Sequence, residues 1–324
     1  MNTPSPVVSF WHRVSAWFAG LLLLSALVLI VTHYGELEHF AELLRQAEPG
    51  WLLVALLLQI ATYVSVAMVW YLALRRTGLH PEFLSLIPLG IAKLFSDQAM
   101  PSGGMSGTAF FIAALNRRGV PAPLCMATLL LSLVAYYGAY LVAAGISLLV
   151  LWYDHAIHPW ILGVAAVFCI VAVGIPAGAL WLRGRGRQEL PPLLLKIPGL
   201  GNLTNAIATA SGELLRDPAL IILTSLFHGA VFVLDAATLW VMLQVVGVET
   251  SFWVAFPSFM FASMVTTVGP IPLGLGSFEV TCVSLLGLLG VPIEAALAAT
   301  LLLRGFTVWL PMLPGIWLAR HELR

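Results

Sequence analysis

Long runs of apolar residues without a single charge limit this chain to a small set of folds. Residues 160–182, for example, contain no Asp, Glu, Lys or Arg. About 20 such residues let one helix cross the hydrocarbon core of a bilayer, where backbone polar groups must be paired within the protein. The chain is 60% hydrophobic and only 9% charged, whereas soluble domains carry about 25% charged residues. We therefore expect an all-α integral membrane protein.

Six stretches have the length and composition of full membrane crossings. They are residues 14–33, 51–74, 122–152, 160–182, 219–247 and 295–319. Two further apolar stretches, 84–116 and 252–290, are too long for one comfortable crossing. Glycine and proline interrupt these stretches at 101–107 and 269–276, and both residue types break helices.

The distribution of basic residues indicates how the two broken stretches lie. Cytoplasmic loops of membrane proteins collect Lys and Arg. If both broken stretches return to the side they enter, one side holds twelve of the fifteen basic residues, the other holds only Arg45, and Lys93 and Arg304 lie in the membrane. A single crossing by 84–116 would put Arg75-Arg76 and Arg117-Arg118 on opposite sides and would weaken this bias. We predict about six full transmembrane helices, two broken re-entrant helical hairpins and cytoplasmic termini.

The sequence contains an internal repeat, in which several residues of the first half recur in the second half at one constant offset. Three groups of residues share this offset: Glu42-Leu43-Leu44-Arg45 recurs as Glu213-Leu214-Leu215-Arg216, Pro101, Gly103 and Ser106 recur as Pro272, Gly274 and Ser277, and Gly119-Val120-Pro121 recurs as Gly290-Val291-Pro292. Internal repeats are common in transporters. We expect a single membrane domain, 1–324, with repeat halves 14–152 and 160–320, and the predicted topology inserts these halves in opposite senses.

Overall charge and cysteine content exclude several classes of function. Fifteen basic residues balance fifteen acidic ones, so nothing in the charge favours nucleic acid as a partner. The three cysteines lie in apolar stretches without metal-ligand spacing. Neither a catalytic triad in plausible order nor a nucleotide-binding glycine loop leading to Lys is present. We expect no metal, no cofactor and no enzymatic activity.

The two helix breaks are the strongest candidates for a binding site. Irregular backbone inside a membrane is tolerated only where protein or a water-filled cavity surrounds it. The helix that follows each break presents free N–H groups and a positive dipole end, which favour phosphate or carboxylate. The substrate-binding candidates here are Ser102, Gly103, Ser106, Pro272, Gly274, Gly276 and Ser277. The serines either cap these helix ends, contact a ligand or satisfy local backbone, and the glycines either serve the site or permit tight packing.

Ionisable residues within the apolar stretches are further candidates because charge is expensive in a bilayer. Lys93 and Asp97 are four residues apart on one helical face and are expected to pair. Glu279 falls in the first turn after the second break, where a carboxylate is favoured. Arg304 is expected to meet either Glu279 or a lipid phosphate. The alternative for each is a buried structural ion pair.

The segment Pro272-Leu-Gly-Leu-Gly-Ser-Phe-Glu279 resembles the flippase-like membrane domain of lysylphosphatidylglycerol synthases and its stand-alone relatives. Gly290-Val291-Pro292 and Leu303-Arg304 extend the likeness, which covers most of the chain. The resemblance implies movement or handling of a polar lipid. Members usually carry Gly-Glu after the first break, whereas this chain has Gly107-Thr108, so Asp97 is at most a displaced substitute. The soluble aminoacyl-transferase domain of the synthases is not recognised here, so the synthetic reaction is not carried over.

Three functions follow from these features. The first is a flippase-like transporter in the plasma membrane, whose partners are membrane lipids with anionic headgroups. The second is an ion- or proton-coupled carrier of a small solute, which would use Asp235 and His228, two helical turns apart. The third is a non-transporting membrane subunit that binds an envelope-lipid enzyme through the basic residues of the 183–196 loop.

Overall fold

The computed structural model describes residues 49–99, 105–185, 212–269, 271 and 274–322. The predicted crossing 14–33 and the first copy of the repeated tetrapeptide, 42–45, fall outside these ranges. The described helices are α3 (Pro49–Arg76), α4 (Phe83–Ala99), α5 (Met105–Arg117), α6 (Ala122–Tyr153), α7 (Pro159–Arg185), the 3-10 turn η1 (Leu214–Arg216), α10 (Pro218–Val245), α11 (Phe252–Val268), α12 (Ser277–Leu288), α13 (Ile293–Arg304), the π-helical turn η3 (Gly305–Trp309) and α14 (Leu310–Glu322). Within the described ranges the regular structure is helical throughout, which confirms the predicted all-α class.

Five of these helical segments have the length and hydropathy of membrane crossings. They are Gly50–Arg76, Ala122–Tyr153, Pro159–Gly184, Pro218–Val245 and Ile293–Ala319. Each coincides with one of the predicted crossings, so the chain is a multi-pass membrane protein. The last segment was predicted as one helix and instead comprises α13, the π turn η3 and α14.

The two long apolar stretches are broken where the glycine and proline residues predict. The first divides into α4 and α5, and the second into α11 and α12. Each of these helices is 12 to 17 residues long, too short to span a bilayer upright. Each break therefore divides an apolar stretch of the sequence into two short helices.

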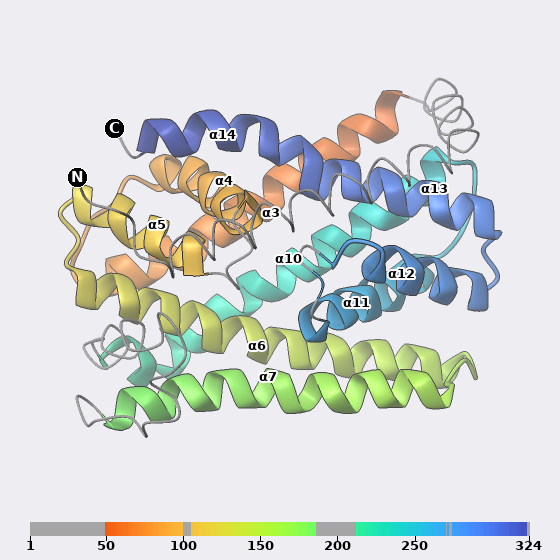
Figure 1. The fold of residues 1–324 in the computed structure, drawn as a ribbon, viewed down its shortest axis with the longest axis horizontal. Helices are drawn as coiled ribbons and strands as arrows, with labels where there is room; N and C mark the ends of the chain where they lie inside the picture. Colours follow the sequence, from red (N-terminus) through yellow and green to blue (C-terminus); the bar gives the residue numbers. More distant parts are fainter. Residues whose placement is uncertain (1–48, 100–104, 186–211, 270, 272–273, 323–324) are drawn as a thin grey trace, which may run out of the picture. The chain divides into compact units, whose positions relative to one another are not determined.

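Helices α3 and α10 pack along one another (Figure 1). Helices α4 and α6 pack against α3, and α6, α11 and α13 pack against α10. The α4–α5 hairpin packs against α3, α6 and α14, and the α11–α12 hairpin packs against α10, α6, α7 and α13. Helix α14 approaches α4 closely: a Cβ atom added at the buried Gly315 would lie 2.6 Å from the Cβ of Phe95. Only glycine lets the two helices meet at this distance.

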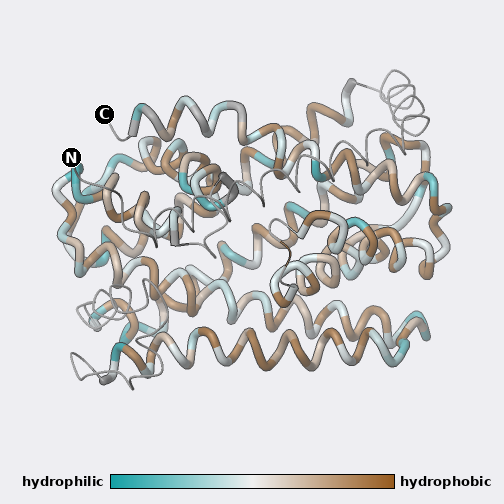
Figure 2. The backbone as a smooth tube through the Cα atoms, viewed as in Figure 1, coloured by the Kyte–Doolittle hydropathy of each residue, from teal (hydrophilic) through white to brown (hydrophobic). Residues whose placement is uncertain are grey.

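Polar residues concentrate at the helix ends, as Figure 2 shows for α7, whose length is dominated by apolar residues. Asp217 begins α10 by accepting a hydrogen bond from Leu220 N at 3.2 Å, and Pro218 supplies a first helical residue that needs no N–H partner. Ser251 begins α11 in the same way, accepting from Trp253 N at 3.2 Å. These caps fix where the crossing and the second hairpin begin.

Candidate functional site

The second helix break requires glycine at two positions. Gly274 and Gly276 have positive φ angles of 63° and 82°, which favour glycine because other residues meet a steric penalty there. The side chain of Thr266 on α11 lies so close to Gly274 that a Cβ atom would overlap it. Gly276 is the last residue before α12. The break is therefore a defined turn that aims the first N–H groups of α12.

Glu279 and Arg304 meet at the start of α12. One carboxylate oxygen of Glu279 accepts a hydrogen bond from Gly276 N at 2.7 Å, and the other accepts from Arg304 Nε at 2.8 Å. The side chains of Arg304 and Glu279 are 11% and 16% exposed, so solvent screens their ion pair only weakly. One carboxylate thus neutralises both a helix N-terminus and a buried guanidinium.

Two further features hold Arg304 in place. Its guanidinium carbon lies 5.0 Å from the ring centroid of Phe278, within the range of a cation–π interaction. The π turn η3 begins directly after Arg304, and π-helical turns often occur at functional positions because they insert one residue into an α-helix. Arg304 therefore ends α13 where the helix changes its winding.

The first break is closed by a carboxylate from the helix that precedes it. Asp97 on α4 accepts a hydrogen bond from Gly107 N of α5 at 2.8 Å through one oxygen, and its other oxygen lies 2.8 Å from Lys93 Nζ. Ser106 Oγ donates to Ser96 O at 2.8 Å across the same break. Asp97 thus bonds a backbone N–H and a basic side chain at the first break, as Glu279 does at the second.

The predicted site residues divide into three groups. The structure brings Lys93 together with Asp97, and Glu279 together with Arg304. Gly274, Gly276, Ser106 and Ser277 lie at the two breaks, where Ser277 Oγ donates to Gly274 O at 3.1 Å. Ser102, Gly103 and Pro272 lie outside the described residues. At Gly107 and Gly276 it is a carboxylate, rather than a serine hydroxyl, that accepts the helix N–H.

A polar cluster lies between α3 and α10, and only Asp235 among its members was identified from the sequence. Gln59 Nε2 donates to Asp235 Oδ1 at 3.1 Å and to Thr238 Oγ1 at 3.2 Å, and Thr62 Oγ1 lies 3.4 Å from the same aspartate oxygen. Gln59, Thr62 and Thr238 are buried. An amide in an apolar span is itself a signal, because a buried amide requires partners.

His228, predicted to act beside Asp235, contacts a different set of residues. Its Nε2 lies 3.1 Å from Ser132 Oγ, and its ring packs edge-on against Tyr136 of α6 at 5.5 Å between centroids. His228 and Asp235 share one helix, but the side-chain hydrogen bonds of His228 go to α6 and those of Asp235 go to α3. Within the described ranges, no group of three His, Cys, Asp or Glu side chains is placed to hold a metal ion.

The two breaks share one chemical arrangement. In each, one backbone N–H at the start of a short helix and one basic side chain bond to the same carboxylate, inside an apolar part of the chain. Phosphate binds to the same two kinds of donor, backbone N–H at a helix start and a basic side chain. Each break therefore holds donors of the kinds that bind phosphate, and these donors are bonded to a carboxylate of the chain itself.

One of two comparisons with known proteins places the chain in a family. A search of curated proteins returned no match. The family model described as the lysylphosphatidylglycerol synthase TM region matches residues 17–315, which include both helix breaks and Arg304. Because the match extends over most of the sequence, this chain belongs to the family of lysylphosphatidylglycerol synthase transmembrane regions.

Proposed function

We propose that this protein is a flippase-like transporter that moves a polar phospholipid with an anionic headgroup between membrane leaflets. Family membership supports a role in lipid handling. The observation that carries the proposal is the convergence of Gly276 N, Glu279 and Arg304 at a helix start within apolar sequence. An unpaired charge there would be costly, and transport of a charged headgroup needs such groups inside the membrane.

In this proposal Glu279 holds the place of the lipid phosphate while no lipid is bound. A phosphodiester that enters displaces the carboxylate from Arg304 and from Gly276 N, so neither donor is left unpaired during the exchange. When the lipid leaves, the carboxylate returns and competes the phosphate off. Asp97, Gly107 and Lys93 offer the same exchange at the first break.

The proposal includes an inverted repeat with two re-entrant hairpins in the plasma membrane, both termini being cytoplasmic. The order and spacing of the helices support the repeat. Helices α3, α4, α5 and α6 begin at Pro49, Phe83, Met105 and Ala122, and helices α10, α11, α12 and α13 begin at Pro218, Phe252, Ser277 and Ile293. Taken pairwise in this order, the starts are separated by the offset of the sequence repeat to within one helical turn.

Leaflet exchange in proteoliposomes tests the proposal. The full chain is reconstituted with fluorescent phospholipids, and exchange is measured by the fraction of label that an impermeant reductant reaches. We expect exchange by the wild type and its loss in Glu279→Gln and Arg304→Lys, because the first keeps the shape without the charge and the second keeps the charge without the planar fork. Exchange no faster than in protein-free liposomes would refute the proposal.

Glu294→Gln is the matched control. Glu294 lies in the first turn of α13, is exposed, and loses the same charge on substitution. It should exchange lipid at the wild-type rate. Each variant is first checked for a monodisperse elution profile, because removal of one partner of a buried ion pair costs about 3–5 kcal/mol.

One observation favours the ion- or proton-coupled carrier as the second candidate. Asp235 is held between α3 and α10 by the neutral donors Gln59 and Thr62, a setting suited to binding and releasing a proton or cation. Under this alternative, Asp235→Asn abolishes solute uptake, while Glu279→Gln leaves it intact. We propose no enzymatic activity for this protein. A third proposal is a non-transporting membrane subunit whose partner is an envelope-lipid enzyme.

A further inference from the structure

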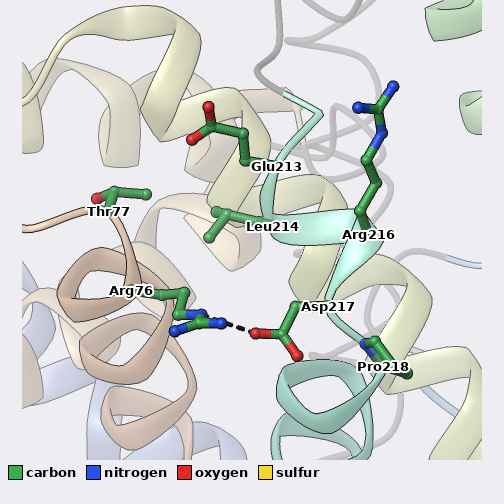
Figure 3. Close-up of a pocket in the computed structure, with 7 residues that line it drawn as sticks. All are labelled: Arg76, Thr77, Glu213, Leu214, Arg216, Asp217 and Pro218. Carbon is green, nitrogen blue, oxygen red and sulfur yellow. Dashed lines mark hydrogen bonds and ion pairs between the residues drawn. The ribbon is translucent and has the colours of Figure 1, made fainter.

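The repeated tetrapeptide Glu213-Leu214-Leu215-Arg216 is not used by the helix breaks, and the structure places it at a pocket (Figure 3). The pocket has a volume of about 480 Å³, within the range of small-molecule sites. It is lined by Arg76, Thr77, Glu213, Leu214, Arg216, Asp217 and Pro218. These residues come from the end of α3 and from the segment that leads into α10.

The pocket lies at the ends of two membrane crossings. One crossing ends at Arg76, and another begins at Pro218. Residues at the end of a crossing lie at the level of the lipid headgroups. Both residues belong to the side that the distribution of basic residues makes cytoplasmic. A ligand in this pocket is therefore at headgroup level in one leaflet.

An ion pair forms the floor of the pocket. Arg76 Nε lies 2.7 Å from Asp217 Oδ2, and this bond uses one of the five N–H donors of the guanidinium. Asp217 also accepts from Leu220 N at the start of α10. That backbone hydrogen bond, with the Arg76 guanidinium adding to it, lowers the pKa of Asp217 below its ordinary value.

Glu213 and Arg216 complete the pocket with one charge of each sign. Both side chains are exposed. Figure 3 shows both side chains extending away from the Arg76–Asp217 pair, with their charged ends apart from one another. Among the described residues no ion pair joins Glu213 to Arg216. The carboxylate is thus open to an amine, and the guanidinium is open to a phosphate.

We infer that this pocket binds the headgroup of a phospholipid that carries both a phosphodiester and a protonated amine, as phosphatidylethanolamine does. The phosphodiester lies against Arg216 and the outer N–H groups of Arg76, and the amine lies against Glu213. A guanidinium suits phosphate because its planar fork donates two parallel hydrogen bonds. The pocket is separate from Glu279 and Arg304, and binding there can be measured without any transport.

Native mass spectrometry of the delipidated full chain tests the inference. The protein is titrated with phosphatidylethanolamine or with phosphatidylglycerol, which has the phosphodiester but no amine. The wild type should bind phosphatidylethanolamine about tenfold more tightly, the effect of one charge-assisted hydrogen bond. Arg216→Gln should weaken both lipids about tenfold, and Glu213→Gln should weaken phosphatidylethanolamine alone. Arg117→Gln, an exposed arginine at the end of α5, is the control and should bind like the wild type.

Three results would overturn the inference. The first is equal binding of the two lipids by the wild type, and the second is equal lipid binding by Arg216→Gln and Arg117→Gln. The third is displacement of bound lipid by soluble glycerophosphoethanolamine at concentrations similar to those of the lipid, because the ligand would then be a soluble phosphate ester. The inference is independent of the proposed transport function. A pocket variant can lose lipid binding while it exchanges lipid at the wild-type rate, and a variant of the helix break can lose exchange while its pocket still binds lipid.

Discussion

Asp97 and Glu279 reach equivalent helix ends from opposite sides of their breaks. Glu279 follows its break in the sequence, and the equivalent position of the first half is Thr108, which has no charge. Asp97 precedes its break and reaches across to Gly107 N. Both carboxylates satisfy a helix N–H that would otherwise be unpaired in apolar surroundings, and such groups cost several kcal/mol. Each break thus has a carboxylate at the start of its second helix, supplied from before the break in one case and from after it in the other.

Gly107 has to be glycine for Asp97 to reach it. It is buried, and a Cβ atom there would overlap the carboxyl group of Asp97. We expect Gly107→Ala to lower the free energy of unfolding by about 1–3 kcal/mol, since it displaces Asp97 from Gly107 N and from Lys93. Thermal unfolding in detergent measures the loss. Gly145→Ala in α6 is the control, because nothing lies within 4 Å of its added Cβ. Equal unfolding temperatures for the two variants would contradict the geometry at the break.

Asp217 should make stability depend on pH in the acidic range. Its pKa is lowered in the folded chain by the hydrogen bond from Leu220 N and by Arg76. The stabilisation is therefore present above the pKa of the unfolded chain, about 4, and is lost as pH falls through the lower folded pKa. We expect the difference in unfolding temperature between wild type and Asp217→Asn to be constant from neutral pH to about pH 5. That difference should shrink below this range, and one that persists in strong acid would contradict the assignment.

At the scale of elements, α3 and α10 are held together by hydrogen bonds that link residues far apart in sequence. Gln59 reaches Asp235 over a separation of 176 residues and Thr238 over 179. Hydrogen bonds between membrane helices contribute about 0.6 kcal/mol each on average. Packing of apolar residues supplies the larger part of the contact, and the polar cluster fixes the register of the two helices.

Two substitutions of Asp235 separate the contribution of its charge from that of its hydrogen bonds. Asp235→Asn keeps an oxygen that accepts from Gln59 and Thr62, and we expect stability within about 0.5 kcal/mol of the wild type. Asp235→Leu removes both bonds and should cost about 1–2 kcal/mol. Equilibrium unfolding in mixed micelles compares the two variants. A cost for asparagine as large as that for leucine would mean that charge, rather than hydrogen bonding, holds the cluster.

Local sequence predicts these elements well and their contacts poorly. The breaks at 101–107 and 269–276 were visible because glycine and proline act on their own backbone. The Glu279–Arg304 and Lys93–Asp97 pairs were foreseen as possibilities because few other charges lie in the apolar stretches. The capping of Gly107 by Asp97, the partners of Asp235 and the π turn after Arg304 were not foreseen. Each of these depends on the tertiary placement of a neighbouring helix.

At the scale of the whole molecule, the central question is the side on which each loop lies. The five described crossings and the two hairpins fix an order of elements, and the distribution of basic residues predicts their orientation. If the hairpins re-enter, each places both of its ends on one side. The two halves then face opposite sides of the membrane. Under the proposed function, a lipid from either leaflet could then replace the carboxylate at one of the two breaks.

Labelling of single cysteines tests this topology. In a background without Cys125, Cys169 and Cys282, cysteines replace the exposed residues His80 and Arg117, which flank the first hairpin, and Glu249 and Glu294, which flank the second. An impermeant maleimide should label Glu249→Cys and Glu294→Cys in intact cells, and His80→Cys and Arg117→Cys only in inverted vesicles. Labelling of His80→Cys and Arg117→Cys from opposite sides would show that the first hairpin crosses the membrane.

The contact between Gly315 and Phe95 joins the two charged sites mechanically. Phe95 lies two residues before Asp97 on α4, and Gly315 belongs to the helix that continues from Arg304 through the π turn. Because there is no room for a methyl group between them, we expect a rotation of α14 to displace α4. The two breaks would then respond as one cooperative unit, in which opening at one leaflet changes the affinity at the other. A double-mutant cycle of Asp97→Asn and Glu279→Gln should show a non-zero coupling energy for lipid affinity. Phe95→Ala should reduce this coupling energy, because it removes the side chain that contacts Gly315.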